Sequence, residues 1–222
     1  HRVDGPISVY RGYDDGTDRE IVNLNNELAD VTMFQSEYSR RKMSELGHVC
    51  INPVVIPNAC DPAIFYSAPL RVPFEKRKIR LLSSSWSNNP KKGFTTYKWL
   101  ESVINPHVFE YTFVGRSPLK FEKIRMIDAV PSEQMAQLLR EHDIYITASE
   151  DEACSNAVLE ALACGLPVIY HDSGGTKELV KEAGFGFRRI GEIPELLSKL
   201  VDEYEYRKKQ ISLISLEEVA IR

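Results

Sequence analysis

Short apolar runs alternate with segments of helical spacing through the second half of the chain. The runs are typical of strands and occupy residues 79–85, 109–115, 143–149 and 167–172. Between and after them, apolar residues three or four positions apart predict helices over residues 92–104, 132–142, 156–163 and 175–183. Strands that alternate with helices form βαβ units. The pattern therefore predicts an α/β fold, a Rossmann-like parallel sheet with helices on both faces.

The first third of the chain carries a weaker form of the same pattern. Residues 31–46 are typical of a strand followed by a helix, and residues 52–65 of a strand followed by a turn. We interpret them as the remnant of a second α/β domain. The expected organisation is an incomplete N-terminal domain (1–66), a proline-containing basic linker (67–77), the Rossmann-like domain (78–203) and a C-terminal helical segment (204–222).

The composition is that of a soluble globular protein, with 43% hydrophobic and 27% charged residues among 222. The net charge of −4 argues against a general nucleic-acid binder, which needs a basic face. We find no apolar run long enough to span a bilayer and no signal-peptide pattern. The four cysteines have no CxxC spacing and no nearby histidine pair, which argues against zinc and predicts buried, reduced thiols in a cytoplasmic protein.

The most informative stretch joins the strand that ends near Ser149 to the helix that begins near Asn156. In an open parallel sheet, ligands bind outside the carboxyl ends of the strands. The start of the following helix offers unpaired N–H groups and a positive dipole, which suit a phosphate. Cys154, Ser155 and Asn156 are small and polar, so their backbone can approach a ligand closely. Ser155 or Asn156 could instead cap the helix.

Two carboxylates flank this helix start, and we interpret both as sugar ligands. Helical side chains lean toward the N-terminus, so Glu160 can reach a ligand there and accept hydrogen bonds from ribose hydroxyls. Glu152, on the loop, could accept hydroxyls of a further sugar. Glu133 and Glu141 have the same spacing, but they lie within one amphipathic helix and are expected to be solvated. Context rather than spacing distinguishes the first pair.

The same stretch carries a resemblance to a known family. EDEACSNAVLEALACGLPVI, followed by SGGTKELV and GFGF, resembles the E-x7-E region of retaining glycosyltransferases of family 4. Further stretches of the chain are similar to other motifs of that family, in the same order. They are ADVTMFQSEYSRRKMSELG with VIPNACDPAIF, SSSWSNNPKKGF, YTFVGRSP and EQMAQLLREHDIYITAS. The resemblance covers most of the chain. It implies the GT-B fold, in which two Rossmann-like domains bind a nucleotide-sugar between them, with the acceptor on the N-terminal side.

The resemblance implies a role for each matching residue. Glu152 would contact the transferred sugar and Glu160 would hold the ribose. Lys92 would neutralise the diphosphate as it departs, unless it is merely exposed at a helix start. The residues expected to bind the rest of the donor are Ser155 and Asn156 at the diphosphate, with Cys154 beside them, and Gly115 and Val130 near the base. The SGG at residues 173–175 is expected to be a turn that shapes the floor of the cleft, or to bind.

The chain departs from the family pattern before Lys92. The family has an arginine at the position of Trp86, and its absence removes a bidentate partner for the diphosphate. Lys91 or Arg116 could substitute, and Trp86 is expected to pack as a loop aromatic. The exchange of the family's FG for ACSN keeps the site small. Whether the loss of the arginine impairs activity stays open.

We therefore expect a glycosyltransferase that transfers a hexose from a nucleotide diphosphate sugar to a glycan or lipid-linked acceptor with retention, as in polysaccharide biosynthesis. The alternatives are a truncated or degenerate nucleotide-binding module without turnover and a GT-B sugar-nucleotide epimerase. The fragment alone is expected to be inactive, and peripheral membrane contact would come from a missing part of the N-terminal domain. Neither a cofactor nor a metal is expected. Asp14, Asp15 and Asp18 could hold a divalent ion, but a turn before a helix is the favoured interpretation.

Overall fold

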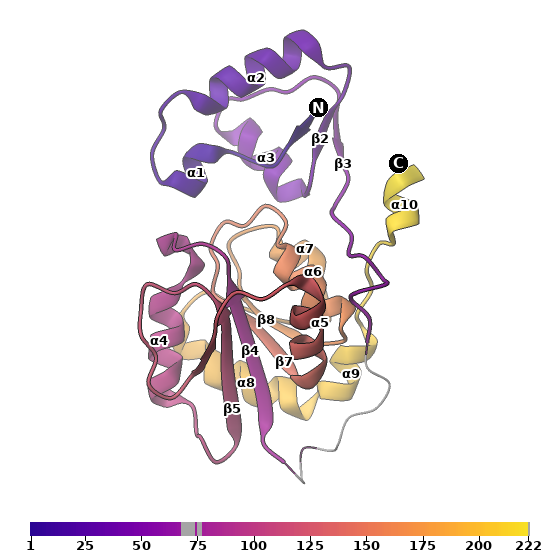
Figure 1. Ribbon diagram of the computed structural model, residues 1–222. Coiled ribbons are helices and arrows are strands. Elements are labelled where there is room, and N and C mark those ends of the chain that lie inside the picture. Colours follow the sequence, from indigo (N-terminus) through magenta and orange to yellow (C-terminus); the bar gives the residue numbers. More distant parts are fainter. Residues whose placement is uncertain (68–73, 75–76, 222) are drawn as a thin grey trace.

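The computed structural model describes residues 1–67, 74 and 77–221, and the described part contains two parallel sheets (Figure 1). The smaller sheet has the order β1-β2-β3. Its elements are β1 (Arg2–Val3), α1 (Ile7–Arg11), α2 (Thr17–Leu28), β2 (Thr32–Phe34), α3 (Glu37–Glu45) and β3 (Pro53–Val55). We call residues 1–56 the N-terminal lobe.

The larger sheet has the order β6-β5-β4-β7-β8-β9, with every neighbouring pair parallel. Its strands are β4 (Ile79–Ser85), β5 (Phe109–Gly115), β6 (Arg125–Ile127), β7 (Ile144–Thr147), β8 (Val168–His171) and β9 (Gly184–Phe187). The helices are α4 (Phe94–Val103), α5 (Ser132–Glu141), α6 (Asn156–Ala163), α7 (Thr176–Val180), α8 (Ile193–Asp202) and α9 (Tyr204–Lys209), with 3₁₀ turns η2 (Pro90–Lys92) and η3 (Ile190–Glu192). We call residues 77–210 the C-terminal lobe.

The strand order places the first and fourth strands of the larger sheet side by side. Leu81 and Leu82 of β4 lie opposite Ile144 and Tyr145 of β7. From β4 the chain proceeds to one edge of the sheet, and from β7 it proceeds to the other. Loops that leave two such strands diverge and open a crevice at their carboxyl ends. The β4–β7 boundary is therefore the topological switch point of this lobe.

Both faces of the larger sheet are covered, which confirms the predicted fold class (Figure 1). On one face α4 and α8 pack against the sheet, and the apolar side chains Phe94, Tyr97 and Leu100 of α4 are at most 4% exposed. On the other face α5 and α6 pack against it through residues such as Leu139 and Val158, which are fully buried. Burial on both faces explains why the strands read as continuous apolar runs.

Several predicted boundaries are wrong. The helix expected over residues 175–183 ends at Val180, because Lys181 has a φ of 48° and cannot continue it. The helix expected over residues 132–142 begins at Ser132 and ends at Glu141, and Pro131 precedes it without a side-chain capping hydrogen bond. The predicted linker, residues 67–77, lies mostly outside the described residues. Phe65, just before it, is already buried in the core of the C-terminal lobe.

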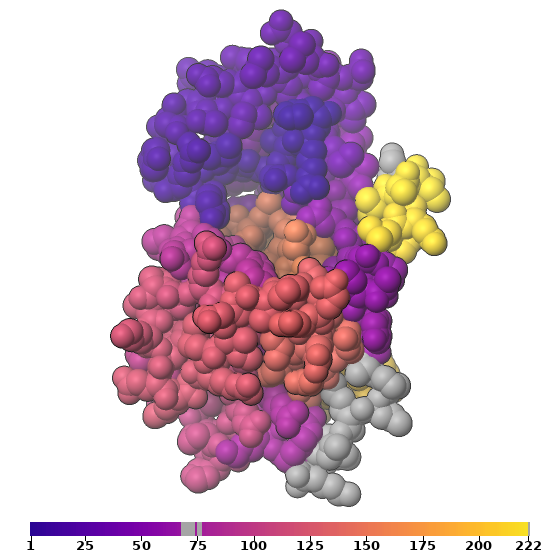
Figure 2. Space-filling model, viewed as in Figure 1, coloured from indigo at the N-terminus to yellow at the C-terminus, as the bar shows by residue number. Residues whose placement is uncertain are grey.

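The two lobes meet at the start of α3. The Glu178 carboxylate of α7 accepts hydrogen bonds from the N–H groups of Glu37 at 2.8 Å and Tyr38 at 2.7 Å. These groups belong to the first turn of α3, where a carboxylate also complements the helix dipole. A hollow remains between the lobes beside this contact (Figure 2). The C-terminal helix α10 (Leu216–Ile221) lines a second hollow, together with the chain that leaves β3.

We predict that Gly93→Ala destabilises the protein more than Gly16→Ala does. Both glycines have positive φ, 73° and 83°, so both substitutions carry the same backbone strain. A Cβ at Gly93 would lie 2.4 Å from the Ala148 carbonyl oxygen, whereas a Cβ at Gly16 meets nothing within 4 Å. Forced overpacking of this kind costs about 1–3 kcal/mol beyond the strain. Urea unfolding of both variants measures the difference, and equal losses would contradict the close approach of the two loops.

Candidate donor-binding site

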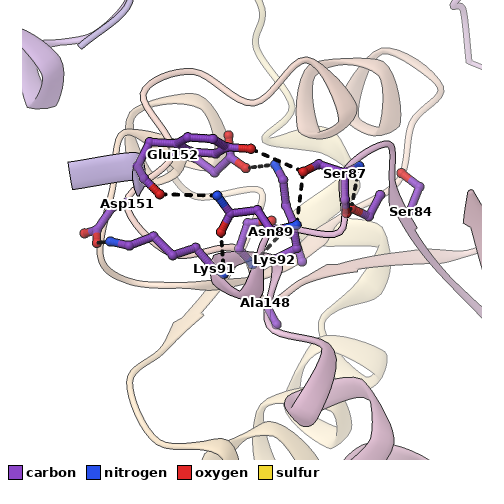
Figure 3. Close-up of polar contacts among 12 residues, drawn as sticks. Ser84, Ser87, Asn89, Lys91, Lys92, Ala148, Asp151 and Glu152 are labelled. Atoms are coloured by element: carbon purple, nitrogen blue, oxygen red, sulfur yellow. Dashed lines mark hydrogen bonds and ion pairs between the residues drawn. The ribbon is translucent and has the colours of Figure 1, made fainter. Parts of the chain in front are cut away.

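Two loops face each other at the switch point, residues 86–93 after β4 and residues 148–155 after β7 (Figure 3). Their backbones are joined, because the Glu150 N–H donates to the Lys91 carbonyl at 2.8 Å. The Ala148 N–H donates to the buried Tyr97 hydroxyl of α4 at 2.9 Å, which fixes the start of the second loop. The side chains that follow are therefore presented from an anchored backbone.

Lysines of the first loop bind carboxylates of the second (Figure 3). Lys91 Nζ lies 2.5 Å from Asp151 Oδ2, and Lys92 Nζ contacts Glu152 Oε1. The side chains of the second pair are each 20% exposed. The structure thus brings Lys92 and Glu152 together, and shows that Lys92 is not simply an exposed lysine at a helix start. Asp151, next to Glu152, is a contact that the sequence did not predict.

Asp151 joins three parts of the molecule. Besides Lys91, its carboxylate accepts a hydrogen bond from the Tyr38 hydroxyl of the N-terminal lobe at 3.1 Å. Its N–H donates to Ser173 Oγ at 2.9 Å, and its φ of 55° is unusual for a residue other than glycine. Burial, followed by the charge of Asp151, raises the pKa of Tyr38 well above its ordinary value. Tyr38 therefore stays a hydrogen-bond donor.

The SGG turn after β8 supports the second loop from below. The Gly175 N–H donates to the Glu152 carbonyl at 2.7 Å. A Cβ on Gly174 would lie 2.5 Å from that same carbonyl oxygen, and one on Gly175 would lie 2.2 Å from the Ala153 oxygen. Both glycines are therefore needed for close backbone packing. The turn shapes the floor of the site, and nothing in its contacts requires a ligand.

Helix α6 begins at Asn156 without a side-chain cap. Ser155 occupies the N-cap position but makes no capping hydrogen bond, so the capping interpretation of Ser155 is wrong. The Asn156 side chain accepts a hydrogen bond from Asn58 Nδ2 at 2.6 Å instead. Cys154, just before the cap, is buried. The first-turn N–H groups of α6 thus have no side-chain acceptor from Ser155.

Two adjoining cavities open at this helix start. The Glu152 cavity, about 340 Å³, lies between the lobes and is lined by Asp151, Glu152, Cys154 and residues 4–7, 9 and 10 among others. The Glu160 cavity, about 430 Å³, is lined by Glu160, by residues 56–61 and by α10. Arg2, Asn58 and Asn156 line both cavities. The two glutamates of the predicted motif therefore face separate cavities that meet at the start of α6.

Glu160 lies in a poorly hydrated place. Burial raises the pKa of its carboxyl to about 7, so part of the population is uncharged near neutral pH. Burial, and then the charge of Glu160, raises the pKa of the nearby Cys60 thiol to about 12. All four cysteines are free thiols, although Cys60 is only half-buried, contrary to the expectation that all would be buried.

The remaining predicted residues lie outside the two cavities. Gly115 has a φ of 106°, and a Cβ there would lie 2.1 Å from the Ser85 oxygen, so packing alone requires glycine. Val130 packs against the core beneath α5 and α6. Trp86 is 45% exposed, so the prediction that it packs is wrong, because it follows the last paired residue of β4. Arg116 is exposed at the end of β5, and Glu133 is exposed on α5 as expected.

The aspartates near residue 15 form turns and a cap. Asp18 accepts from the N–H groups of Ile7 at 2.7 Å and Ser8 at 3.0 Å, and so caps α1. Asp14 and Asp15 accept from the N–H groups two residues further on. Within residues 1–67, 74 and 77–221, no group of three or more His, Cys, Asp or Glu side chains could hold a metal ion.

Sequence reasoning missed the N-terminal contribution to the site. Arg2, Tyr38 and Asn58 line the cavities, but no local pattern marks Arg2, and Tyr38 lies in the QSEYSRR stretch that resembles a family motif without being singled out there. Asn58 lies in the NACDPAIF stretch that resembles a family motif, which could have identified it.

The family comparison covers the later part of the C-terminal lobe. Residues 119–212 match the family model of glycosyl transferases group 1. Sulfoquinovosyl transferase SQD2 of Arabidopsis thaliana is 27% identical over 101 residues, covering 40% of this chain and 20% of that protein.

Solved structures share the fold at low identity. HepE of Anabaena in complex with UDP-glucose is 18% identical, with a TM-score of 0.74 over 93% of this chain and 63% of that one. Sucrose-phosphate synthase of Thermosynechococcus elongatus is 15% identical, with a TM-score of 0.76 over 100% of this chain and 65% of that one. The chain thus spans less than two thirds of these relatives. The predicted resemblance to GT-B glycosyltransferases is confirmed by the family match and these neighbours. No helix in the described ranges is both long and apolar enough to cross a membrane.

We predict that Glu160→Gln stabilises the protein more at pH 8 than at pH 5. A carboxyl whose folded-state pKa is about 7 rather than 4.5 favours folding below pH 4.5, and this contribution is lost as the pH rises to 7. The glutamine of the variant does not ionise, so the variant does not lose this stability. Its free energy of unfolding relative to wild type should therefore rise by about 2 kcal/mol between pH 5 and pH 8. Urea unfolding at both pH values measures it. The exposed Glu133→Gln is the control, and a flat difference for both variants would show that Glu160 is well hydrated.

Proposed function

We propose that the protein is a glycosyltransferase that moves a hexose from a nucleotide diphosphate sugar to a glycan or lipid-linked acceptor. The observation that carries the proposal is the pair of adjoining cavities at the start of α6, one lined by Glu152 and the other by Glu160. A nucleotide-sugar has two sugar rings joined by a diphosphate, and the site has two carboxylates on either side of a helix N-terminus. The UDP-glucose complex of the similar HepE supports this class of donor.

In this proposal each part of the donor meets a matching group. Glu160 accepts the ribose hydroxyls, and its raised pKa reduces repulsion with the nearby phosphates. Glu152 accepts hydroxyls of the transferred hexose. The first-turn N–H groups of α6, at Ser155 and Asn156, bind the diphosphate through hydrogen bonds and the helix dipole.

The chemistry is then positioning and electrostatic stabilisation. Lys92 is bound to Glu152, and would follow the negative charge that develops on the diphosphate as the glycosidic bond breaks. Lys91, bound to Asp151, would add a second positive charge. We assign no nucleophilic side chain. Leaving-group stabilisation by cations and a helix start needs no metal, and a metal-free reaction remains part of the proposal.

The finer assignments rest on the family resemblance. It favours retention of configuration, a role in polysaccharide biosynthesis, and a cytoplasmic enzyme that works at the inner face of the membrane when its acceptor is lipid-linked. Gly115 and Val130 would approach the base through the backbone.

A second candidate is a nucleotide-binding module without turnover. Trp86 favours it, because this exposed residue stands where the family has an arginine. Such a module would bind nucleotide but release no sugar from any donor. Incubation with nucleotide-sugars and an acceptor extract, with released nucleoside diphosphate as the readout, separates the two candidates. Because residues 1–222 alone are expected to be inactive, the assay is done on the longest protein that carries them.

We predict that the chain binds one of UDP, GDP and ADP, and that Glu160→Ala and Lys92→Ala each weaken this binding. Loss of a hydrogen bond or ion pair to a charged group corresponds to about a tenfold or larger loss of affinity. Isothermal titration calorimetry of wild type and both variants with each nucleotide gives the dissociation constants. Glu133→Ala, a carboxylate removed from an exposed helix face, should bind as wild type does. Absence of binding to all three nucleotides at millimolar concentration would overturn the donor site.

A further inference from the structure

We propose that Arg2 of the N-terminal lobe binds the donor diphosphate, and so supplies the guanidinium that the C-terminal lobe lacks at Trp86. This inference rests on the proposed function and deepens it. It adds a binding residue from the opposite side of the crevice, 84 positions from the place where the family pattern has its arginine.

The position of Arg2 follows from the two cavities. The diphosphate of a nucleotide-sugar is the group between the hexose and the ribose. With the hexose at Glu152 and the ribose at Glu160, the diphosphate must pass the place where the two cavities meet. Only three described residues line both cavities, and they are Arg2, Asn58 and Asn156. Arg2 therefore faces the start of α6 across the crevice.

The charge around this junction is otherwise negative. Asp4, Asp151 and Glu152 line the Glu152 cavity, and Asp61 and Glu160 line the Glu160 cavity. Among the described residues that line either cavity, Arg2 is the one Lys or Arg. A diphosphate placed among carboxylates needs a cation beside it.

The other candidate cations are less well placed. Lys91 and Lys92 are bound to Asp151 and Glu152, and neither lines the two cavities. Arg116 is exposed at the end of β5 and lines neither cavity. The substitutes expected from the sequence for the missing arginine thus line neither cavity, whereas Arg2 lines both.

Arg2 can change partners at little cost. Its Nε lies 2.8 Å from Asp4 Oδ1, and the two side chains are 49% and 70% exposed. Ion pairs of such exposure are weak, and a planar guanidinium suits the oxygens of a phosphate. Burial raises the pKa of the Cys154 thiol, and the positive charge of Arg2 is close enough to oppose that rise. Arg2 and Cys154, the residue that precedes the cap of α6, also line the same cavity.

The test compares a nucleoside diphosphate with its nucleoside. Calorimetry on the wild-type chain first selects the tightest binder among UDP, GDP and ADP. Arg2→Gln should weaken that diphosphate about tenfold or more, and should leave the parent nucleoside within about threefold. Arg2→Lys keeps the positive charge but loses the planar guanidinium. Its affinity for the diphosphate should lie between those of wild type and Arg2→Gln. Arg116→Gln removes a guanidinium from outside the cavities and should bind as wild type does.

Each result has one meaning. If Arg2→Gln binds the diphosphate as tightly as wild type, or weakens diphosphate and nucleoside equally, the assignment of Arg2 is overturned while the donor site stands. If the wild type binds none of the three diphosphates, the proposed function fails, and the role of Arg2 with it. Thermal unfolding confirms that Arg2→Gln is folded. Should it not fold, an unchanged diphosphate affinity of Arg2→Lys would overturn the need for the guanidinium fork.

Discussion

The contact between the loops after β4 and β7 is the constraint on which the site depends. Gly93 lies so close to Ala148 that no side chain fits between them, and the Glu150 N–H is bonded to the Lys91 carbonyl. These backbone contacts bring a loop with two lysines against a loop with two carboxylates. They also fix where α6 begins, because α6 follows the second loop directly. A lateral shift of either loop would separate both ion pairs and turn the helix start away from the crevice.

The two ion pairs neutralise the charges of the loops that carry them. Each lysine holds one carboxylate, so neither loop carries uncompensated charge into the crevice. A donor must therefore compete with Asp151 and Glu152 for the lysines. Binding of its diphosphate then depends more on the start of α6 and on any nearby guanidinium. Partial exposure of these pairs keeps them exchangeable, since water screens what is lost when a pair opens. The same arrangement would be a poor design for a permanently bound anion and suits one that arrives and departs.

In the larger sheet, the sequence predicted the strands that are buried on both faces and missed those that are not. β4, β5, β7 and β8 are continuous apolar runs, whereas β6 consists of Arg125–Ile127 and β9 is Gly184–Phe187, with two glycines in four residues. The predicted helices did not include α8, although the spacing of Ile193, Leu197 and Leu200 is typical of an amphipathic helix. Glu152, Glu160 and Lys92 were predictable because each lies beside a strand end or a helix start. Arg2 and Tyr38 were not, because only the packing of one lobe on the other brings them to the site.

That packing is itself set by polar groups at the site, so the lobes and the crevice are not independent. Glu178 binds the first N–H groups of α3, and Asp151 binds the Tyr38 hydroxyl on the same helix. Both carboxylates belong to the C-terminal lobe, and both hold the N-terminal lobe at a point beside the second loop. The strained φ of Asp151 is consistent with a residue over-determined by contacts on three sides. Any ligand that draws Lys91 away from Asp151 also changes the charge that faces Tyr38, so occupancy of the crevice and the approach of the lobes are physically linked.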